Sequence, residues 1–193
     1  MRLPLVAALT AVALASSASG AAPKPQITDA TADQLPVAGA GYDVVSALFA
    51  TSGTTTKVKK KKIYTPTKLV ITLTYAGDVP TDEYATQVVE FDAPGCSDIY
   101  LQAYAATTAT YGQGDCLPED TSVSFNAKAA GKTMTFTLPL NLFGAGVLKA
   151  GTSLTNLVTY TAYAEPVLGI EPGFVGPEAQ VDHAETAAAY RVA

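Results

Sequence analysis

Short runs of alternating apolar and polar residues recur along the chain, and they predict β-strands rather than helices. The clearest run is Ile63–Tyr75. From Leu69 onward, large apolar residues (Leu69, Ile71, Leu73 and Tyr75) alternate with the β-branched residues Val70, Thr72 and Thr74. A period of two places alternate side chains on opposite faces of a sheet. Similar runs, bounded by turn-forming residues, predict strands at Gln26–Thr28, Tyr42–Phe49, Ile63–Tyr75, Tyr84–Phe91, Ile99–Ala105, Ser122–Ala127, Thr133–Leu138, Leu154–Ala164 and Ala187–Val192.

Seven to nine such strands without a long helical period predict an all-β protein. We expect a single antiparallel β-sandwich of the immunoglobulin or jelly-roll type, with a closed barrel as the alternative. Ala129–Lys132 is typical of a hairpin turn, and Leu140–Phe143 of one short helical turn. Residues 165–184 are rich in proline, glycine and glutamate, which indicates an irregular, exposed loop.

Residues 1–21 have the layout of a secretory signal peptide. Arg2 precedes an apolar run over residues 3–14, and small residues follow. Cleavage is expected after Ala21, with Ala15 as the alternative. A membrane-spanning helix is disfavoured because the apolar run is shorter than the roughly 20 residues that a bilayer requires. We therefore divide the chain into a leader, an entry segment over residues 22–40 and a β-sandwich domain over residues 41–193.

Charge and cysteine content narrow the class of protein further. Without the leader, the chain has 11 Lys and Arg against 17 Asp and Glu, a net charge of −6. Nucleic acid is therefore not an expected partner, because its binding depends on neutralising phosphates. The two cysteines, Cys96 and Cys116, predict a disulfide in an exported protein. A redox or metal site is the alternative, but the chain has no C-x-x-C motif. We expect a secreted monomer with no stable membrane insertion after cleavage.

Five segments of the chain carry a resemblance when taken together: Tyr42–Ser46, Pro66–Thr74, Gly95–Cys96, Gly131–Leu140 and Leu148–Thr152. They resemble segments of secreted β-sandwich proteins of actinobacteria. The architecture that they imply is similar to the superfamily of DOMON domains and family-9 carbohydrate-binding modules. That superfamily binds sugars, haem or calcium in its different branches, so the resemblance implies a binding domain. The chain has no tryptophan, which departs from the pattern of sugar binding between paired tryptophans.

Four aspartates form a candidate metal site. Asp29 and Asp33 lie in the entry segment, Asp43 opens the next strand, and Asp182 precedes the last strand. Calcium takes six to eight oxygen ligands, mostly carboxylates and carbonyls from turn-rich segments. The resemblance implies a calcium site at about this place. The alternative is that these aspartates form turns and helix or strand caps.

The run Lys57-Val58-Lys59-Lys60-Lys61-Lys62 places five positive charges in six residues. These charges repel one another and must be solvated, so we expect a hairpin tip or a ragged strand start. Contact with an acidic cell-wall polymer or glycan is the functional interpretation. The alternative is a soluble loop that keeps a sheet edge from pairing with another chain.

Four of the ten tyrosines are candidate ligand-binding residues: Tyr100, Tyr104, Tyr160 and Tyr163. Aromatic faces can stack on sugar rings while the phenol hydroxyl stays hydrated. The alternative is that these tyrosines are half-buried edges of the core.

Catalysis is not expected. His183 is the one histidine, it is interpreted as a surface-loop residue, and no nucleophile turn accompanies it. The sequence therefore predicts a secreted, non-catalytic ligand-binding or surface-interaction module, with glycan as the expected ligand class. A purely structural or protein-interaction domain is the alternative.

Overall fold

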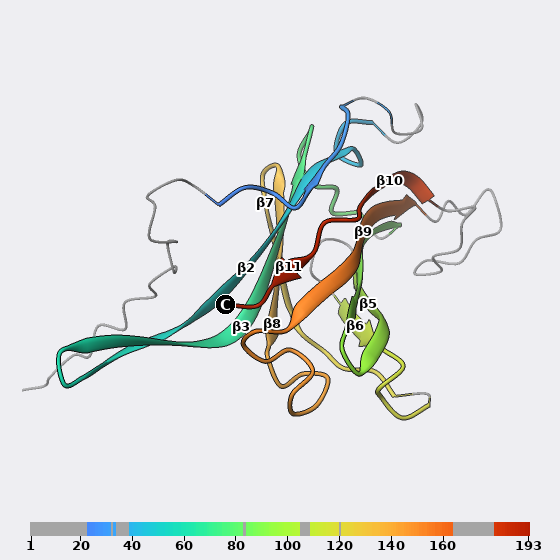
Figure 1. Cartoon of the computed structure of the whole chain (residues 1–193). Coiled ribbons are helices and arrows are strands. Elements are labelled where there is room, and N and C mark those ends of the chain that lie inside the picture. The colour runs from blue at the N-terminus through green and yellow to red at the C-terminus, as the bar shows by residue number, and fades with distance from the viewer. Residues whose placement is uncertain are drawn as a thin grey trace, which may run out of the picture.

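The structure is a computed structural model, and it describes residues 23–31, 33, 39–82, 84–104, 109–119, 121–163 and 180–193. The described residues form two antiparallel sheets that pack face to face (Figure 1), so the predicted β-sandwich is confirmed. The predicted leader over residues 1–21 lies outside the described residues, as do residues 164–179. Within the described part of the chain, no helix has the length and hydrophobicity that a membrane crossing requires.

The first sheet has the order β1-β2-β3-β8-β7, and every neighbouring pair is antiparallel. Its centre is β3, which pairs with β2 on one side and with β8 on the other. The strands are β1 (Ile27–Thr28), β2 (Val44–Val58), β3 (Lys61–Tyr75), β7 (Asn126–Ala130) and β8 (Thr133–Pro139).

The second sheet has the order β10-β9-β4-β5-β6, again antiparallel throughout, and β11 pairs with the start of β9. Its central strand, β4, lies between β9 and β5. The strands are β4 (Ala85–Ala93), β5 (Cys96–Tyr104), β6 (Ala109–Gln113), β9 (Ser153–Tyr163), β10 (Gln180–Thr186) and β11 (Tyr190–Arg191).

The core lies between the two sheets and follows the alternation seen in the sequence. Leu69, Ile71 and Leu73 of β3 are fully buried, while the residues between them are partly exposed. Phe49 and Phe91 meet across the core with ring centroids 6.2 Å apart and nearly perpendicular planes. Burying one large aliphatic or aromatic side chain stabilises the fold by roughly 1.5–3 kcal/mol, so this apolar layer holds the sheets together.

Some elements differ from the sequence-based expectation. The described residues contain eleven strands rather than seven to nine, because β6 and β10 were not predicted. β10 begins within residues 165–184, which were expected to be an irregular loop, and it continues to Thr186. Its sequence is mostly polar, and it becomes a strand by pairing with β9 and burying Ala184. β6 contains Gly112, where an added Cβ would lie 3.0 Å from the Val123 side chain, so close packing there leaves little room for a larger residue.

Several boundaries also shift, most of all that of β2, which continues beyond its expected end at Phe49 to Val58. β7 begins at Asn126, four residues after the expected start at Ser122, and β11 covers only Tyr190–Arg191 of the expected 187–192. Residues 140–143 form turns and not a helical turn. Strand ends depend on where a partner strand stops pairing, and a single sequence does not show this.

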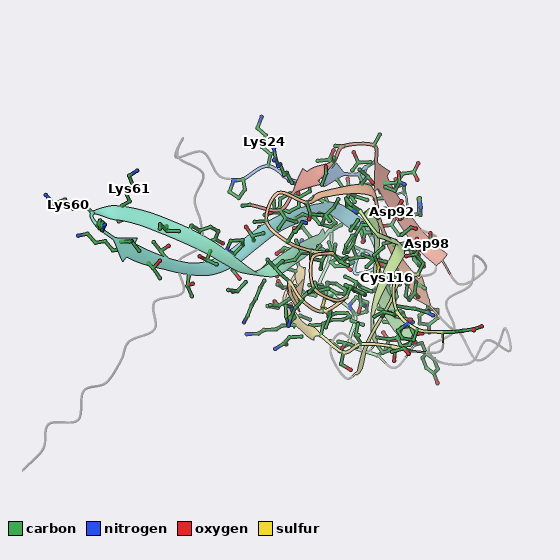
Figure 2. The ribbon with its side chains drawn as sticks, turned by 60° about the horizontal axis from the view of Figure 1, so that its bottom comes forward. Lys24, Lys60, Lys61, Asp92, Asp98 and Cys116 are labelled. Carbon is green, nitrogen blue, oxygen red and sulfur yellow. A yellow bond between two sulfur atoms is a disulfide. The ribbon has the colours of Figure 1, made fainter. Side chains whose placement is uncertain are left out.

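The β2–β3 hairpin extends well beyond the sandwich (Figures 1 and 2). Its tip is a two-residue turn in which Lys59 and Lys60 have φ values of +45° and +72°, as primed hairpin turns require. The lysine run is therefore a hairpin tip, as predicted. Near the base, an added Cβ at Gly53 would lie 2.1 Å from the Thr65 carbonyl oxygen, so only glycine allows the strands to approach there.

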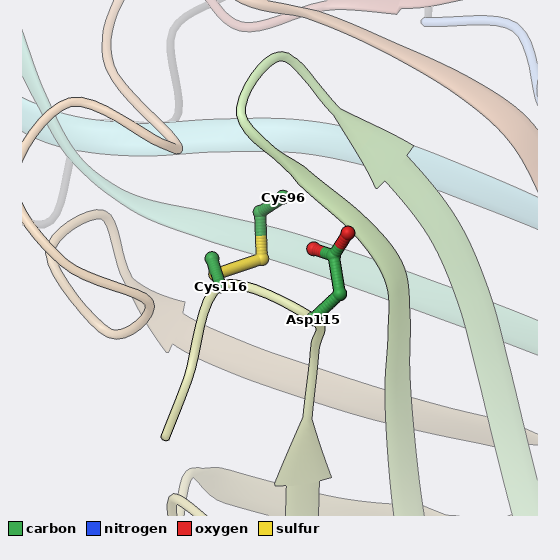
Figure 3. Close-up of side chains that lie close together, drawn as sticks. All are labelled: Cys96, Asp115 and Cys116. Atoms are coloured by element: carbon green, nitrogen blue, oxygen red, sulfur yellow. A yellow bond between two sulfur atoms is a disulfide. The ribbon is translucent and has the colours of Figure 1, made fainter. Parts of the chain in front are cut away.

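A disulfide joins Cys96, at the start of β5, to Cys116, which follows β6 (Figure 3). The adjacent Asp115 accepts hydrogen bonds from the Ser97 N–H and the Ser97 hydroxyl, both at 2.6 Å. Because both sulfur atoms are consumed in the bond, this group is not a thiolate metal site. A disulfide is typical of an oxidising compartment.

Replacing both cysteines, as in Cys96→Ser/Cys116→Ser, is expected to lower the free energy of unfolding by about 3 kcal/mol. The bond closes a loop with a sequence separation of 20 residues and so restricts the unfolded chain. Denaturant melts of the variant and of the wild type measure the difference. Equal midpoints and slopes would contradict a stabilising role for the disulfide.

Candidate functional site

The outer face of the second sheet carries a group of tyrosines. In β5, Ile99, Leu101 and Ala103 point into the core, so Tyr100 and Tyr104 point away from it. Strand register then decides which residues join them on the same face. The outward residues that the structure brings together are Tyr100, Gln102 and Tyr104 of β5, Tyr111 and Gln113 of β6, Val88 and Glu90 of β4, Tyr160 of β9 and His183 of β10.

Val88 lies near the centre of this group. Its side chain points away from the core but is nevertheless fully buried. Its cross-strand partners are Gln102 on one side and Tyr160 on the other. Gln102 in turn pairs with Tyr111, and Tyr160 with His183. One row of the sheet therefore runs from His183 to Tyr111, with aromatic side chains toward both ends and a small aliphatic residue in the middle. We call this surface the tyrosine face.

Three phenol hydroxyls on the tyrosine face donate hydrogen bonds to side-chain oxygens. Tyr160 donates to Oε1 of Glu90 at 2.8 Å. Tyr100 donates to Oε1 of Gln102, a residue of the same strand, at 3.0 Å. In β6, the phenol of Tyr111 likewise donates to Oε1 of Gln113 at 3.0 Å. These bonds orient the rings and hold the face in one arrangement.

Ring contacts and burial hold the same tyrosines in place. Tyr100 and Tyr111 contact each other edge to face, with centroids 6.4 Å apart, and Tyr160 stacks on His183 at 6.4 Å. Burial is the main cause that raises the pKa of Tyr100, Tyr104 and Tyr160 above the ordinary value, so these phenols stay neutral at physiological pH. Tyr160 is only 4% exposed. It supports the face, and its half-buried neighbours offer the accessible ring surface.

Tyr163 does not belong to the tyrosine face. It lies three positions after Tyr160 in β9, and an odd spacing points the two side chains to opposite sides of the sheet. Its ring packs edge-on against Tyr42 at 5.6 Å and against Tyr84 at 6.0 Å. The phenol of Tyr42 donates to Oδ2 of Asp82 at 3.0 Å. Of the four predicted ligand tyrosines, the structure therefore groups three and separates Tyr163.

Tyr111, Gln113 and His183 are residues of the tyrosine face that the sequence did not single out. A signal for the first two exists, because Tyr100-Leu101-Gln102 and Tyr111-Gly112-Gln113 repeat the same Tyr-x-Gln spacing. His183 was interpreted as a loop residue, whereas it is an exposed residue of β10. Nothing in the local sequence predicts its stacking on Tyr160, because β10 was not predicted.

The predicted aspartates gather at one end of the sandwich. Carboxylate oxygens of Asp29, Asp33 and Asp182 all lie within 4.8 Å of one another. Asp182 is nearly buried, and its Oδ2 accepts a hydrogen bond from the Val44 N–H at 2.6 Å. Asp29 accepts one from the Ala30 N–H at 2.9 Å, while its Oδ2 is buried and has no hydrogen-bond partner.

Asp43 is the fourth predicted ligand, and it is 1% exposed. Its charge acts on both Asp29 and Asp182, so it lies near the cluster without being one of the three residues in mutual contact. Burial, followed by the charges of Asp29, Asp33 and Asp43, raises the pKa of Asp182 to about 6, against the effect of the Val44 N–H bond. The four acids therefore form a site of concentrated negative charge.

The cluster has the chemistry of a calcium site. Oxygens bound to one Ca²⁺ at 2.3–2.6 Å lie no more than about 5 Å apart, which the three carboxylates satisfy. A cation would also supply a partner to the buried Oδ2 of Asp29 and relieve the repulsion among like charges. That calcium binds here stays a prediction.

Compared with protein-family models, with curated proteins and with solved structures, the chain matches none of them. The geometry of the tyrosine face and of the acidic cluster therefore carries the functional argument.

Without calcium, Asp182→Asn is expected to stabilise the protein at pH 7–8 by on the order of 2 kcal/mol. The folded-state pKa of about 6 exceeds the ordinary value of 3.8, so the folded protein binds more protons between these values. Stability therefore falls as the pH rises through this window, and the full cost is present above pH 6. Asparagine removes the charge and still accepts the Val44 N–H bond.

Thermal melts of Asp182→Asn and the wild type from pH 4 to pH 8, in the presence of a chelator, measure this effect. Asp78→Asn, at an exposed aspartate, is the matched control and should follow the wild type. A variant that is less stable than the wild type at pH 8 would contradict the expectation.

Calcium in hundredfold excess over its dissociation constant should raise the free energy of unfolding by about 2.7 kcal/mol. Asp29→Asn and Asp182→Asn should each remove most of this gain, and Asp78→Asn should keep it. Melting temperatures with added calcium and with a chelator provide the measurement. An unchanged wild-type melting temperature would contradict calcium binding. The aspartates would then only accept backbone hydrogen bonds in turns and between strands.

Proposed function

We propose that the protein is a secreted, non-catalytic binding module whose ligand surface is the tyrosine face, and that its ligand class is glycan. The observation that carries the proposal is the arrangement of Tyr100, Tyr104 and Tyr111, which lie on one face of β5 and β6 with their rings partly exposed. Amide groups of Gln102 and Gln113 lie between and beside them.

The chemistry of this face suits a sugar polymer. Sugar rings present C–H groups that pack on aromatic faces, and they present hydroxyls that bond with amides and carboxylates. Partly exposed phenol rings offer the first kind of contact, while Gln113 and Glu90 offer the second. The Tyr160–Glu90 bond and the Tyr100–Tyr111 contact keep the face in one arrangement, so little freedom is lost on binding.

Export is supported by two independent features. The layout of residues 1–21 predicts a signal peptide, and the Cys96–Cys116 disulfide suits an oxidising compartment outside the cytoplasm. A purely structural or protein-interaction domain is the alternative function. It predicts no dependence of any glycan interaction on the tyrosine face.

Tyr100→Ala/Tyr111→Ala is expected to weaken glycan binding by at least about fivefold, because each of the two lost aromatic contacts removes about 0.5–1.5 kcal/mol. Tyr100→Phe/Tyr111→Phe keeps the rings and should lose only the part that depends on the hydroxyls. A screen of glycans and cell-wall fractions identifies the ligand, and titration calorimetry then compares the variants.

Tyr84→Ala is the matched control, because Tyr84 packs against Tyr163 and not on the tyrosine face. It should bind the ligand as the wild type does, and thermal melts verify that each variant is folded. A screen without any bound glycan, or a glycan bound equally by Tyr100→Ala/Tyr111→Ala, would refute the proposal.

A further inference from the structure

The distal part of the β2–β3 hairpin, residues 53–66, is here called the arm. The last pair between β3 and β8 is Lys68–Pro139, and beyond it β3 continues for seven residues to Lys61 with β2 as its partner. At about 3.4 Å per residue, this ribbon extends roughly 24 Å from the sheet. Figure 2 shows Lys60 and Lys61 at its far end, well away from Asp92 and Asp98 on the body.

The tip of the arm concentrates positive charge without compensation. All five lysines of the run 57–62 are exposed, and no acidic residue occurs between Thr51 and Lys68. Lys57 and Lys62 are direct cross-strand partners, an arrangement in which like charges destabilise a hairpin. None of the five forms an ion pair within the described residues. An anionic partner would relieve this repulsion.

The same tip exposes apolar surface. Val58 is 49% exposed and Ile63 is 47% exposed, and they are the large hydrophobic residues that are exposed in the described part of the chain. The register pairs Val58 with Lys61 and Thr56 with Ile63, and these two pairs lie on the same side of the ribbon. One side of the arm therefore combines two aliphatic side chains with a lysine.

We infer that the arm docks the protein on the surface of an anionic lipid bilayer. Lysines next to such a surface are attracted to the headgroup phosphates. Aliphatic side chains are stabilised when they leave water and enter the boundary between headgroups and acyl chains. A soluble polyanion would attract the lysines equally but would leave Val58 and Ile63 in water. The pairing of lysines with the two exposed aliphatic residues thus favours a bilayer. The arm binds at the surface of the bilayer and does not cross it.

The length of the arm suits the charge of the rest of the molecule. Outside the leader and the lysine run, the chain carries 6 basic and 17 acidic residues, so an anionic surface repels the body. The Debye length is about 8 Å at physiological ionic strength. A ribbon of roughly 24 Å holds the body about three Debye lengths away, where this repulsion is largely screened.

Co-sedimentation with vesicles tests the inference. The purified protein should bind vesicles of 30% phosphatidylglycerol and 70% phosphatidylcholine, with an affinity that falls as salt rises, and should not bind pure phosphatidylcholine. Lys59→Glu/Lys60→Glu should weaken binding at least tenfold. Val58→Ser/Ile63→Ser should weaken it severalfold while leaving the salt dependence unchanged. All these positions are exposed, so the variants should melt as the wild type does.

Lys128→Glu/Lys149→Glu is the matched control. It makes the same change in net charge at two exposed lysines of the body, and it should bind as the wild type does. An equal loss of vesicle binding in this control would show a general charge effect and overturn the role of the arm.

Absence of binding to anionic vesicles would overturn the inference as well. So would full binding by Val58→Ser/Ile63→Ser together with competition by soluble polyphosphate, because the partner would then be a polyanion. Glycan binding at the tyrosine face is independent of all these outcomes.

Discussion

The burial of apolar side chains between the two sheets is the interaction on which the rest of the structure depends. β2, β3 and β8 contribute one inner face, and β4, β5 and β9 contribute the other. Because side chains alternate along a strand, a one-residue slip in register would turn the apolar set outward, so this core fixes the register of every strand that it includes. The position of each outward residue follows from it. Tyr100 and Tyr104 lie on the tyrosine face because the residues that alternate with them, Ile99, Leu101 and Ala103, are buried in the core.

The acidic cluster depends on a second constraint, the closure of the sandwich at one edge. β1 and β10 are near neighbours although about 150 residues separate them in the sequence. The hydrogen bond from the Val44 N–H to Asp182 joins the start of β2 in one sheet to β10 in the other. A negative charge is thereby held in a nearly buried position beside Asp29 and Asp33. Such a position is unfavourable unless a proton or a cation occupies it, so we expect the stability of this edge to respond to pH and to divalent ions.

The molecule also separates its charges in space. Outside the leader and the lysine run, acidic residues outnumber basic ones, while five lysines lie at the end of a ribbon that takes no part in the core. A two-stranded ribbon of this kind gains little stability of its own, so the sandwich must hold its base in register. Gly53 permits the close approach of the two strands there. The tyrosine face and the arm are thus two surfaces of different chemistry on one rigid core.

The sequence alone determined the class of fold, the positions of the strongly alternating strands, the disulfide and the hairpin with its lysine tip. In each case a local pattern, such as the period of two in Ile63–Tyr75 or the single pair of cysteines, was sufficient. Even the separation of Tyr160 from Tyr163 was implicit in their odd spacing. Tertiary structure alone decided that β10 exists, that His183 stacks on Tyr160 and that Tyr111 joins Tyr100. These features arise from pairing between strands distant in sequence. A polar strand such as β10 becomes regular only when a neighbour satisfies its backbone, so no local pattern can reveal it.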